Sequence, residues 1–202
     1  MEKLDVFSSL IKILASQTGN ILNYSEIAST LGVSLPTVKN YLWYLEKTFI
    51  IQKISPYFKN IRKEITKSPT VYFNDLGLRN YALGIFGQVN RPDDFGFLFQ
   101  NFIFNLLKTK IQFSAAKINF WRTKEKAEVD FVINWGGKII PIEVKYQGFK
   151  KPTTGRSLRS FINKYQPEKA LVITKDFEQK LKINKTTIEF LPFWQIIFRN
   201  YL

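Results

Sequence analysis

The residues best suited to chemistry are acids and a lysine on either side of a glycine pair. Glu128 and Asp130 precede Gly136-Gly137, and Glu143 and Lys145 follow it. Carboxylates bind hard divalent ions such as Mg²⁺ or Mn²⁺, and a nearby lysine can stabilise negative charge developing on a phosphoryl group. The pattern therefore suggests metal-assisted phosphodiester hydrolysis, which needs no histidine.

The glycine pair predicts how these side chains meet. A two-residue turn at Gly136-Gly137 makes a hairpin in which Asp130 faces Glu143 and Glu128 faces Lys145. Because residues two apart share a face, all four side chains would point the same way. The opposite face would then be apolar: Val129, Phe131 and Ile133 against Ile140, Ile142 and Val144.

Two opposed carboxylates, with β-carbons about 4.5–5.5 Å apart, repel each other. A divalent ion held by Asp130, Glu143 and the carbonyl of Val144 would stabilise that arrangement. The alternative is an ordinary Glu128–Lys145 ion pair, with the other acids on a solvated sheet face.

Composition excludes several other chemistries. The 202 residues contain no cysteine and no histidine, which excludes disulfides, structural zinc, cysteine nucleophiles and Ser-His-Asp triads. There is no P-loop, so no bound nucleotide is expected. With no signal peptide and no apolar run long enough to span a membrane, we expect a cytoplasmic protein without membrane association.

A net charge of +14 favours a polyanionic partner, most simply DNA. The alternative is that a lysine-rich composition only keeps the chain soluble. Residues 138–185 hold twelve basic residues against four acids, and Lys150 and Lys151 of this stretch are expected to contact DNA.

Residues 1–90 predict a winged helix. Helices are expected over about 4–16, 25–31 (capped by Ser25) and 34–47, followed by strands at 49–54 and 70–73 joined by a basic loop. The residues expected to contact DNA lie on the third helix and in this loop: Lys39, Asn40, Lys47, Lys59, Arg62 and Lys63. Alternatively, Trp43 and Tyr44 on the third helix contact a protein.

Residues 91–202 predict a second, α/β domain with a mixed sheet, which makes the whole chain α+β. A nearly all-apolar helix is expected at 95–108, and another helix at 158–165. Strands are expected at 117–122, 127–134, 138–146, 170–174 and 188–191, before a final helix at 193–201.

Several motifs in order give a resemblance to a known family. They are the segments 72–78 (YFNDLGL), 96–102 (GFLFQNF), 120–122 (FWR), 128–133 (EVDFVI) and 142–145 (IEVK). This order resembles the C-terminal region of a family of prokaryotic AAA-type ATPases. In that family a P-loop module, absent from this chain, precedes a winged helix and a domain resembling the PD-(D/E)XK nucleases.

The resemblance implies catalytic roles for Asp130, Glu143 and Lys145, with Mg²⁺ or Mn²⁺ on the two acids. It also places Gln100 at a helix position where the family usually has glutamate, and an amide there adds no negative charge. Gln100, Arg122 and Glu128 are therefore assigned to support the site or contact substrate.

Three functions remain open from the sequence. The first is a Mg²⁺- or Mn²⁺-dependent nuclease that binds DNA. The second is a non-catalytic DNA-binding or regulatory module that works with an AAA-type ATPase partner or self-associates. The third is a protein–protein adaptor that uses the aromatic surface around Trp43 and Tyr44.

Overall fold

The computed structural model describes residues 2–87 and 92–198, except for the side chains of residues 2, 3, 61, 63 and 92–94. It divides into two compact units. The first comprises the described residues up to 55 together with 66–101, and the second comprises 56–65 with the described residues from 102 onward. The sequence prediction placed the domain boundary between residues 90 and 91, and so it assigned 56–65 to the first domain.

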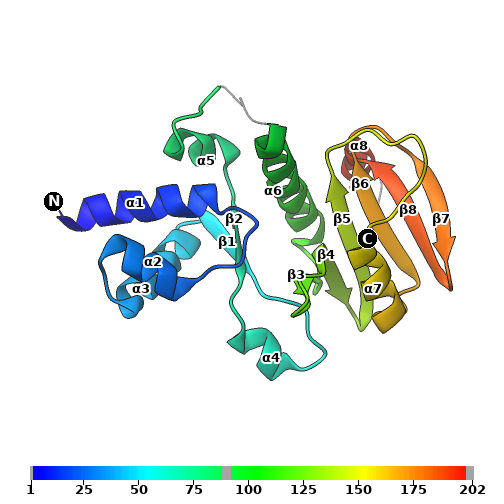
Figure 1. Cartoon of the computed structure of the whole chain (residues 1–202), viewed down its shortest axis with the longest axis horizontal. Coiled ribbons are helices and arrows are strands. Elements are labelled where there is room, and N and C mark those ends of the chain that lie inside the picture. The colour runs from blue at the N-terminus through cyan, green and yellow to red at the C-terminus, as the bar shows by residue number, and fades with distance from the viewer. Residues whose placement is uncertain (1, 88–91, 199–202) are drawn as a thin grey trace. The chain divides into compact units, whose positions relative to one another are not determined.

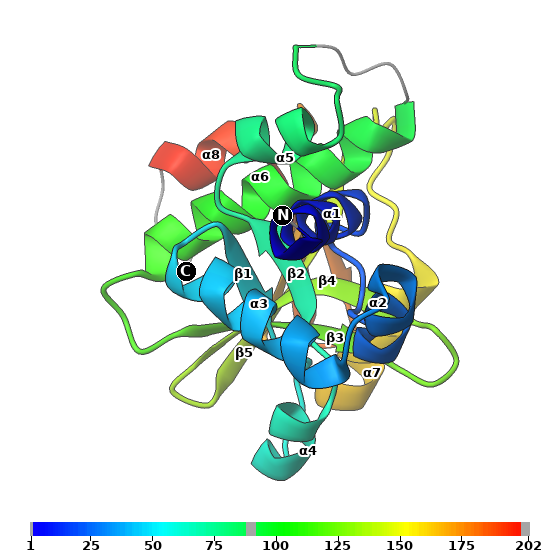
Figure 2. The ribbon, with the colours of Figure 1, turned by 90° about the vertical axis from the view of Figure 1, so that its left-hand side faces the viewer.

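The first unit is mainly helical, with one two-stranded sheet. Figure 2 shows its helices around the strand pair, in which β1 and β2 run antiparallel from Ile51↔Phe73 to Ile54↔Thr70. Its elements are α1 (Glu2–Ser16), α2 (Tyr24–Leu31), α3 (Leu35–Lys47), β1 (Ile51–Ile54), β2 (Thr70–Phe73) and α5 (Leu76–Ala82). The three expected helices and two strands are confirmed as elements.

Short polar caps set the ends of these helices. Asn23 accepts from Glu26 N at 3.2 Å and begins α2, two residues before the expected cap at Ser25. Gly32 ends α2 in the left-handed region (φ 63°), which glycine adopts without steric cost. Ser34 then accepts from Thr37 N at 3.3 Å, so that α3 begins directly after this short turn.

Two residues of the segment 72–78 have structural roles. Asn74 Nδ2 donates to the carbonyl of Phe49 at 2.6 Å, and Asp75 caps α5 by accepting from Leu78 N at 2.8 Å. Asn101 also supports this region, because its amide bonds both backbone groups of Phe73, at 2.9 and 2.7 Å. This part of the motif pattern therefore has a local structural explanation.

Residues 56–65 of the basic segment between β1 and β2 belong to the second unit, and they include most of a helix that was not expected, α4 (Ile61–Thr66). Pro56 forms a β-bridge with Phe120, and the Tyr57 ring lies 5.4 Å from that of Tyr165. Tyr57 is buried, so aromatic packing holds this segment in the core of the second unit.

The second unit is built on one mixed sheet in the order β3-β4-β5-β6-β8-β7 (Figure 1). Its remaining elements are α6 (Pro92–Ile111, of which residues from 102 belong to this unit), β3 (Lys117–Arg122), β4 (Glu128–Trp135), β5 (Lys138–Lys145), α7 (Arg156–Tyr165), β6 (Lys169–Thr174), β7 (Gln179–Ile183), β8 (Thr186–Pro192) and α8 (Phe193–Phe198). The expected mixed α+β architecture is confirmed.

Over the described residues the sheet is mixed, with three antiparallel and two parallel pairs of neighbouring strands. β3, β4 and β5 are antiparallel, β5, β6 and β8 are parallel, and β7 returns antiparallel to β8. The crossover from β5 to the parallel β6 carries α7, whose Leu158, Phe161 and Ile162 are buried in the core on one face. β7 was not expected because its sequence QKLKI is a largely exposed, lysine-bearing edge strand.

The length and hydropathy of the helices decide whether any of them could span a membrane. Over residues 2–87 and 92–198, we find no helix with the length and apolar character that crossing a bilayer demands.

Candidate metal-binding site

The glycine pair forms the expected turn. Gly136 and Gly137 have φ of 57° and 82°, and the strands pair from Trp135↔Lys138 to Phe131↔Ile142. These pairs confirm the predicted hairpin register up to Phe131 and Ile142, and Asp130 and Glu143 are the residues that follow them.

Asp130 lies at an irregularity in β4 where that backbone pairing ends. β3 pairs Asn119 with Val132 but Trp121 with Val129, so Phe120 alone opposes two residues of β4. Such a bulge locally twists a strand and redirects its side chains. The bulge is therefore the local structure that sets the position of the Asp130 carboxylate.

The bulge also corrects the expected division of faces. Val129 and Val132 both pack in the core with α7, whereas the Phe131 ring lies 6.0 Å from Phe104 of α6. Simple alternation had placed Val129, Phe131 and Ile133 together. This prediction fails because one inserted residue interrupts the alternation of side chains between the two faces of the strand.

The Asp130 carboxylate is partly buried and takes a backbone donor from the neighbouring strand. Its Oδ2 accepts from Val144 N at 2.7 Å. Burial raises the pKa of Asp130 to about 7, against the lowering effects of this hydrogen bond and of Lys145, while Glu143 and Glu128 raise it further. A nearby cation would stabilise the ionised form of an acid in this environment.

Glu143 and Lys145 form an ion pair on β5. Lys145 Nζ lies 2.9 Å from Glu143 Oε1, and the Glu143 side chain is only 8% exposed. Burial lowers the pKa of Lys145, but the charge and hydrogen bond of Glu143 more than offset this and leave the pKa raised. Lys145 is therefore a cation at neutral pH and not a general base.

Glu128 and Arg122 pair with each other across β3 and β4. Arg122 Nη1 lies 3.2 Å from Glu128 Oε2, and burial raises the pKa of Glu128 while Arg122 lowers it. The alternative of a Glu128–Lys145 ion pair is not what the structure shows, because Glu128 pairs with Arg122 and Lys145 pairs with Glu143 on its own strand.

We call Asp130, Glu143 and Lys145 the carboxylate–lysine site. Its donor set fits a hard divalent ion, because two carboxylates and the Val144 carbonyl are oxygen ligands on adjacent strands. Within the described ranges, no group of three or more acids lies close enough together to hold a metal ion. A metal here would therefore need water or substrate oxygens as further ligands.

Gln100 makes its described contacts with residues of the first unit. Its Nε2 donates to the Tyr72 hydroxyl at 3.1 Å, and its Oε1 lies 3.3 Å from where a β-carbon on Gly19 would be. Gly19 has φ 81°, so glycine both adopts this backbone conformation and leaves room for the amide.

The residues expected to contact DNA divide between the two units. Lys39, Asn40 and Lys47 are exposed on α3, and Lys47 Nζ lies 5.9 Å from the centroid of Trp43, itself 51% exposed. In the second unit Lys59, Arg62, Lys150 and Lys151 are exposed, and the Lys63 side chain lies outside the described residues.

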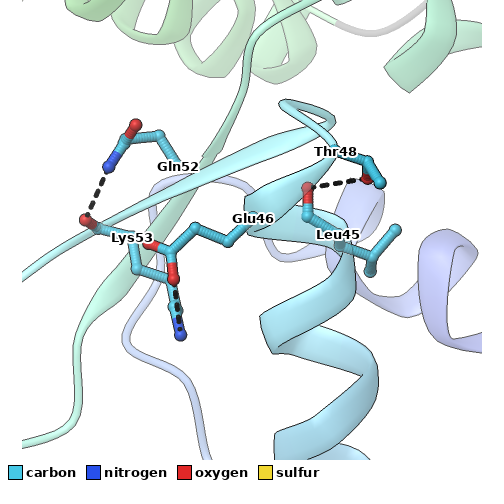
Figure 3. A network of polar contacts seen from close by, with 5 residues as sticks. All are labelled: Leu45, Glu46, Thr48, Gln52 and Lys53. Atoms are coloured by element: carbon cyan, nitrogen blue, oxygen red, sulfur yellow. Dashed lines mark hydrogen bonds and ion pairs between the residues drawn. The ribbon is translucent and has the colours of Figure 1, made fainter.

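One lysine of the first unit, Lys53, is already neutralised by an ion pair. Lys53 Nζ on β1 lies 2.9 Å from Glu46 Oε2 on α3, as Figure 3 shows. In the same view Gln52 donates to the Lys53 carbonyl at 3.5 Å, and Thr48 donates to that of Leu45 at 3.4 Å. Lys53 therefore contributes less to the field of the first unit than its charge suggests.

Two features beside the site were missed from the sequence. Gly155 begins α7, and a β-carbon placed there would lie 3.1 Å from Glu143 Oε1. Arg156 and Arg159 follow on the exposed side of α7. The available signal was the alternation of basic and apolar residues at helical spacing in 156–165.

Gly155→Ala tests how closely Glu143 is packed. The added methyl group must displace the Glu143 carboxylate by a few tenths of an ångström, so we expect divalent-ion affinity to fall about threefold to tenfold. The backbone at Gly155 (φ −65°) is open to any residue, and the melting temperature should therefore change by less than about 2 °C. Isothermal titration with Mn²⁺ and thermal melting measure the two effects, with Gly148→Ala, at an open position, as the control. Equal ion affinity in both variants would refute the packing argument.

Comparison with known proteins identifies two uncharacterised domains. A family model described as a domain of unknown function (DUF8612) matches residues 1–89, and one described as a domain of unknown function (DUF4143) matches residues 95–196. DUF4143 is known in proteins associated with AAA-type ATPases.

Curated relatives are longer than this chain. Uncharacterized proteins of Mycobacterium bovis and Mycobacterium tuberculosis are each 27% identical over 178 residues, which is 87% of this chain and 39% of theirs. An uncharacterized protein of Haemophilus influenzae is 25% identical over 94% of this chain and 45% of its own length. The chain thus spans less than half of these relatives. Because the second family model covers half of the chain, the chain belongs to the DUF4143 family.

Proposed function

We propose that this chain binds DNA and hydrolyses its phosphodiester bonds with Mg²⁺ or Mn²⁺. In this proposal the first unit is a winged helix and the second a PD-(D/E)XK nuclease-like domain. The observation that carries it is that Asp130 accepts from the backbone of Val144, the residue between the ion-paired Glu143 and Lys145 on the adjacent strand. Such a group can hold a hard cation beside a fixed ammonium.

The residues of the carboxylate–lysine site have separate roles in this proposal. Asp130 and Glu143 hold the ion, which would supply an activated water and polarise the phosphoryl oxygen. Val144 N orients Asp130 by donating to its Oδ2 at 2.7 Å. Lys145, charged at neutral pH, stabilises the negative charge that develops on the phosphate.

Charge and exposure support DNA as the substrate. The chain carries 30 basic residues against 16 acids, and basic side chains are exposed in both units. In the first unit, a helix-turn-helix precedes a strand pair, and Lys39 and Asn40 are exposed on its second helix, α3. These features suit phosphate contacts, which supply most sequence-independent affinity.

A second function is favoured by one observation at the same site. Lys145 already neutralises Glu143 at 2.9 Å, and the described residues offer no third acid for a metal. A non-catalytic DNA-binding or regulatory module that works with an AAA-type ATPase would keep this fold without hydrolysis. The length of the curated relatives leaves room for such a partner domain in those proteins.

A cleavage assay with the purified chain separates the two functions. Labelled duplex, single-stranded and branched DNA are incubated with Mn²⁺, Mg²⁺ or EDTA. We expect cleavage with a divalent ion and none with EDTA. Salt-sensitive binding without cleavage under any metal would favour the non-catalytic module. Absence of binding at about 50 mM salt, where electrostatic affinity is strong, would favour a protein adaptor instead.

A further inference from the structure

We propose that the exposed side of α7 binds the phosphate backbone of the DNA strand that reaches the carboxylate–lysine site. We call this surface the α7 basic face, and it consists of Arg156, Arg159, Ser160, Asn163 and Lys164. The inference rests on the proposed function, which it extends by assigning a strand-binding surface.

The α7 basic face is a hollowed surface of one charge sign. Its five residues line a shallow cavity of about 470 Å³. The helix sequence RSLRSFINKY holds three basic residues and no acid. Its apolar residues Leu158, Phe161 and Ile162 are buried on the opposite side, so the helix is fixed to the sheet while its charges face outward.

Hydrogen bonds orient the donors on this face. Arg159 Nε donates to Thr154 Oγ1 at 3.0 Å, which fixes the plane of the guanidinium and the direction of its terminal nitrogens. Asn163 Oδ1 accepts from Asn184 Nδ2 at 3.3 Å, which leaves the amide NH₂ of Asn163 directed to other acceptors. A planar fork beside neutral donors suits phosphate oxygens.

Lys164 is held at the far end of the face by aromatic rings. Its Nζ lies 5.3 Å from the centroid of Tyr165 and 5.9 Å from that of Trp121. Lys59 Nζ lies 5.9 Å from the same Tyr165 ring, so a further cation from the segment 56–65 gathers there. The positive surface therefore continues beyond the end of α7.

The start of α7 adjoins the carboxylate–lysine site. A β-carbon placed on Gly155 would lie 3.1 Å from Glu143 Oε1, and Arg156 is the next residue. From there the ten residues of α7 extend about 15 Å, roughly four nucleotide steps of a duplex strand. A strand whose scissile phosphate reached Glu143 would have its neighbouring phosphates beside Arg156, Arg159 and Lys164.

The test compares two charge-matched double variants of the full chain. Arg156→Gln/Arg159→Gln removes two charges from the α7 basic face. Lys117→Gln/Lys138→Gln removes two exposed charges at the first residues of β3 and β5. Affinity for a labelled duplex is measured in EDTA, where no cleavage occurs, over a range of salt concentrations. Thermal melting confirms that each variant is folded, and Arg156→Gln alone serves if the α7 double variant is not.

We expect the α7 double variant to lose about tenfold or more in affinity. The slope of log affinity against log salt should fall by about two, since each lost phosphate contact removes about 0.9. The Lys117/Lys138 control should lose less than about threefold.

Three outcomes would overturn the inference. Equal losses in the two double variants would mean that only net charge matters, and would leave the proposed function standing. Wild-type chain that binds no DNA would overturn both proposals. If the α7 basic face bound vesicles of anionic lipid but not DNA, its partner would be a lipid surface and the inference of DNA binding would be wrong.

Discussion

Asp130→Asn and Lys145→Met each reduce metal-dependent DNA cleavage by about 100-fold to 1000-fold, while affinity for DNA in EDTA changes by less than about threefold. Asp130→Asn keeps the side-chain shape and the acceptor for Val144 N but removes an anionic ligand. Lys145→Met keeps the aliphatic stem but removes the cation that stabilises the transition state. The loss of one preorganised charged group costs a factor of this size. Single-turnover cleavage with saturating Mn²⁺ is the measurement.

Matched controls separate a site effect from a charge effect. Asp176→Asn changes an exposed acid after β6, and Lys138→Met changes an exposed lysine at the start of β5. Both controls should retain cleavage within about twofold of wild type. If Asp130→Asn cleaved as fast as Asp176→Asn, the site would have no part in the reaction, and any nuclease activity would have to reside elsewhere.

The sequence was sufficient to predict the pairing that builds the site, because a glycine-glycine turn determines register. The positive φ at Gly136 and Gly137 fixes the hairpin, and the pairs up to Phe131↔Ile142 follow. The pairing up to Phe131 and Ile142 could therefore be expected from residue numbers alone, whereas the position of the Asp130 carboxylate also depends on the bulge in β4.

The sequence was not sufficient to predict the bulge in β4. Nothing in 128–133 (EVDFVI) indicates where a residue is inserted, since acid and apolar residues alternate over 128–131 and only apolar residues follow. The bulge arises from the pairing with β3, where Phe120 opposes two residues. Tertiary packing against β3 determines such a feature, and so Val129 was predicted on the same face as Phe131 although it lies on the other.

The segment 56–65 shows a second limit of sequence patterns. Its basic residues suggested an exposed loop, and that prediction did not take account of Tyr57, which precedes them. Tyr57 is buried against Phe161 and Tyr165, which come from more than 100 residues later in the chain. Local charge cannot reveal such a long-range contact, but it does not exclude one either, because Lys59 and Arg62 remain exposed.

Asp130→Asn should also make the metal-free protein more stable at pH 8. The pKa of Asp130 is raised from 3.8 to about 7, so the folded chain binds this proton more tightly than the unfolded chain does. The stabilisation from that proton is present below about pH 4 and is lost as the pH rises to about 7. Asparagine avoids the loss, because it carries no charge and still accepts from Val144 N.

We expect a gain of about 2 kcal/mol in the free energy of unfolding at pH 8, reduced from the full shift because the side chain is partly exposed. This corresponds to a melting temperature about 4–8 °C higher, and the difference should disappear near pH 4. Calorimetry in EDTA from pH 4 to pH 8 measures the trend, with Asp176→Asn as the control.

Added Mn²⁺ should reverse the order of stability. An ion bound by ionised Asp130 stabilises the folded wild-type chain in proportion to the logarithm of its concentration, whereas Asp130→Asn lacks that anionic ligand. Wild type should therefore melt above the variant in millimolar Mn²⁺ at pH 8 and below it in EDTA. If the variant were more stable in EDTA but Mn²⁺ moved neither melting temperature, burial of the acid would be confirmed and the metal site refuted. The carboxylate would then be a feature of the hairpin and not a ligand.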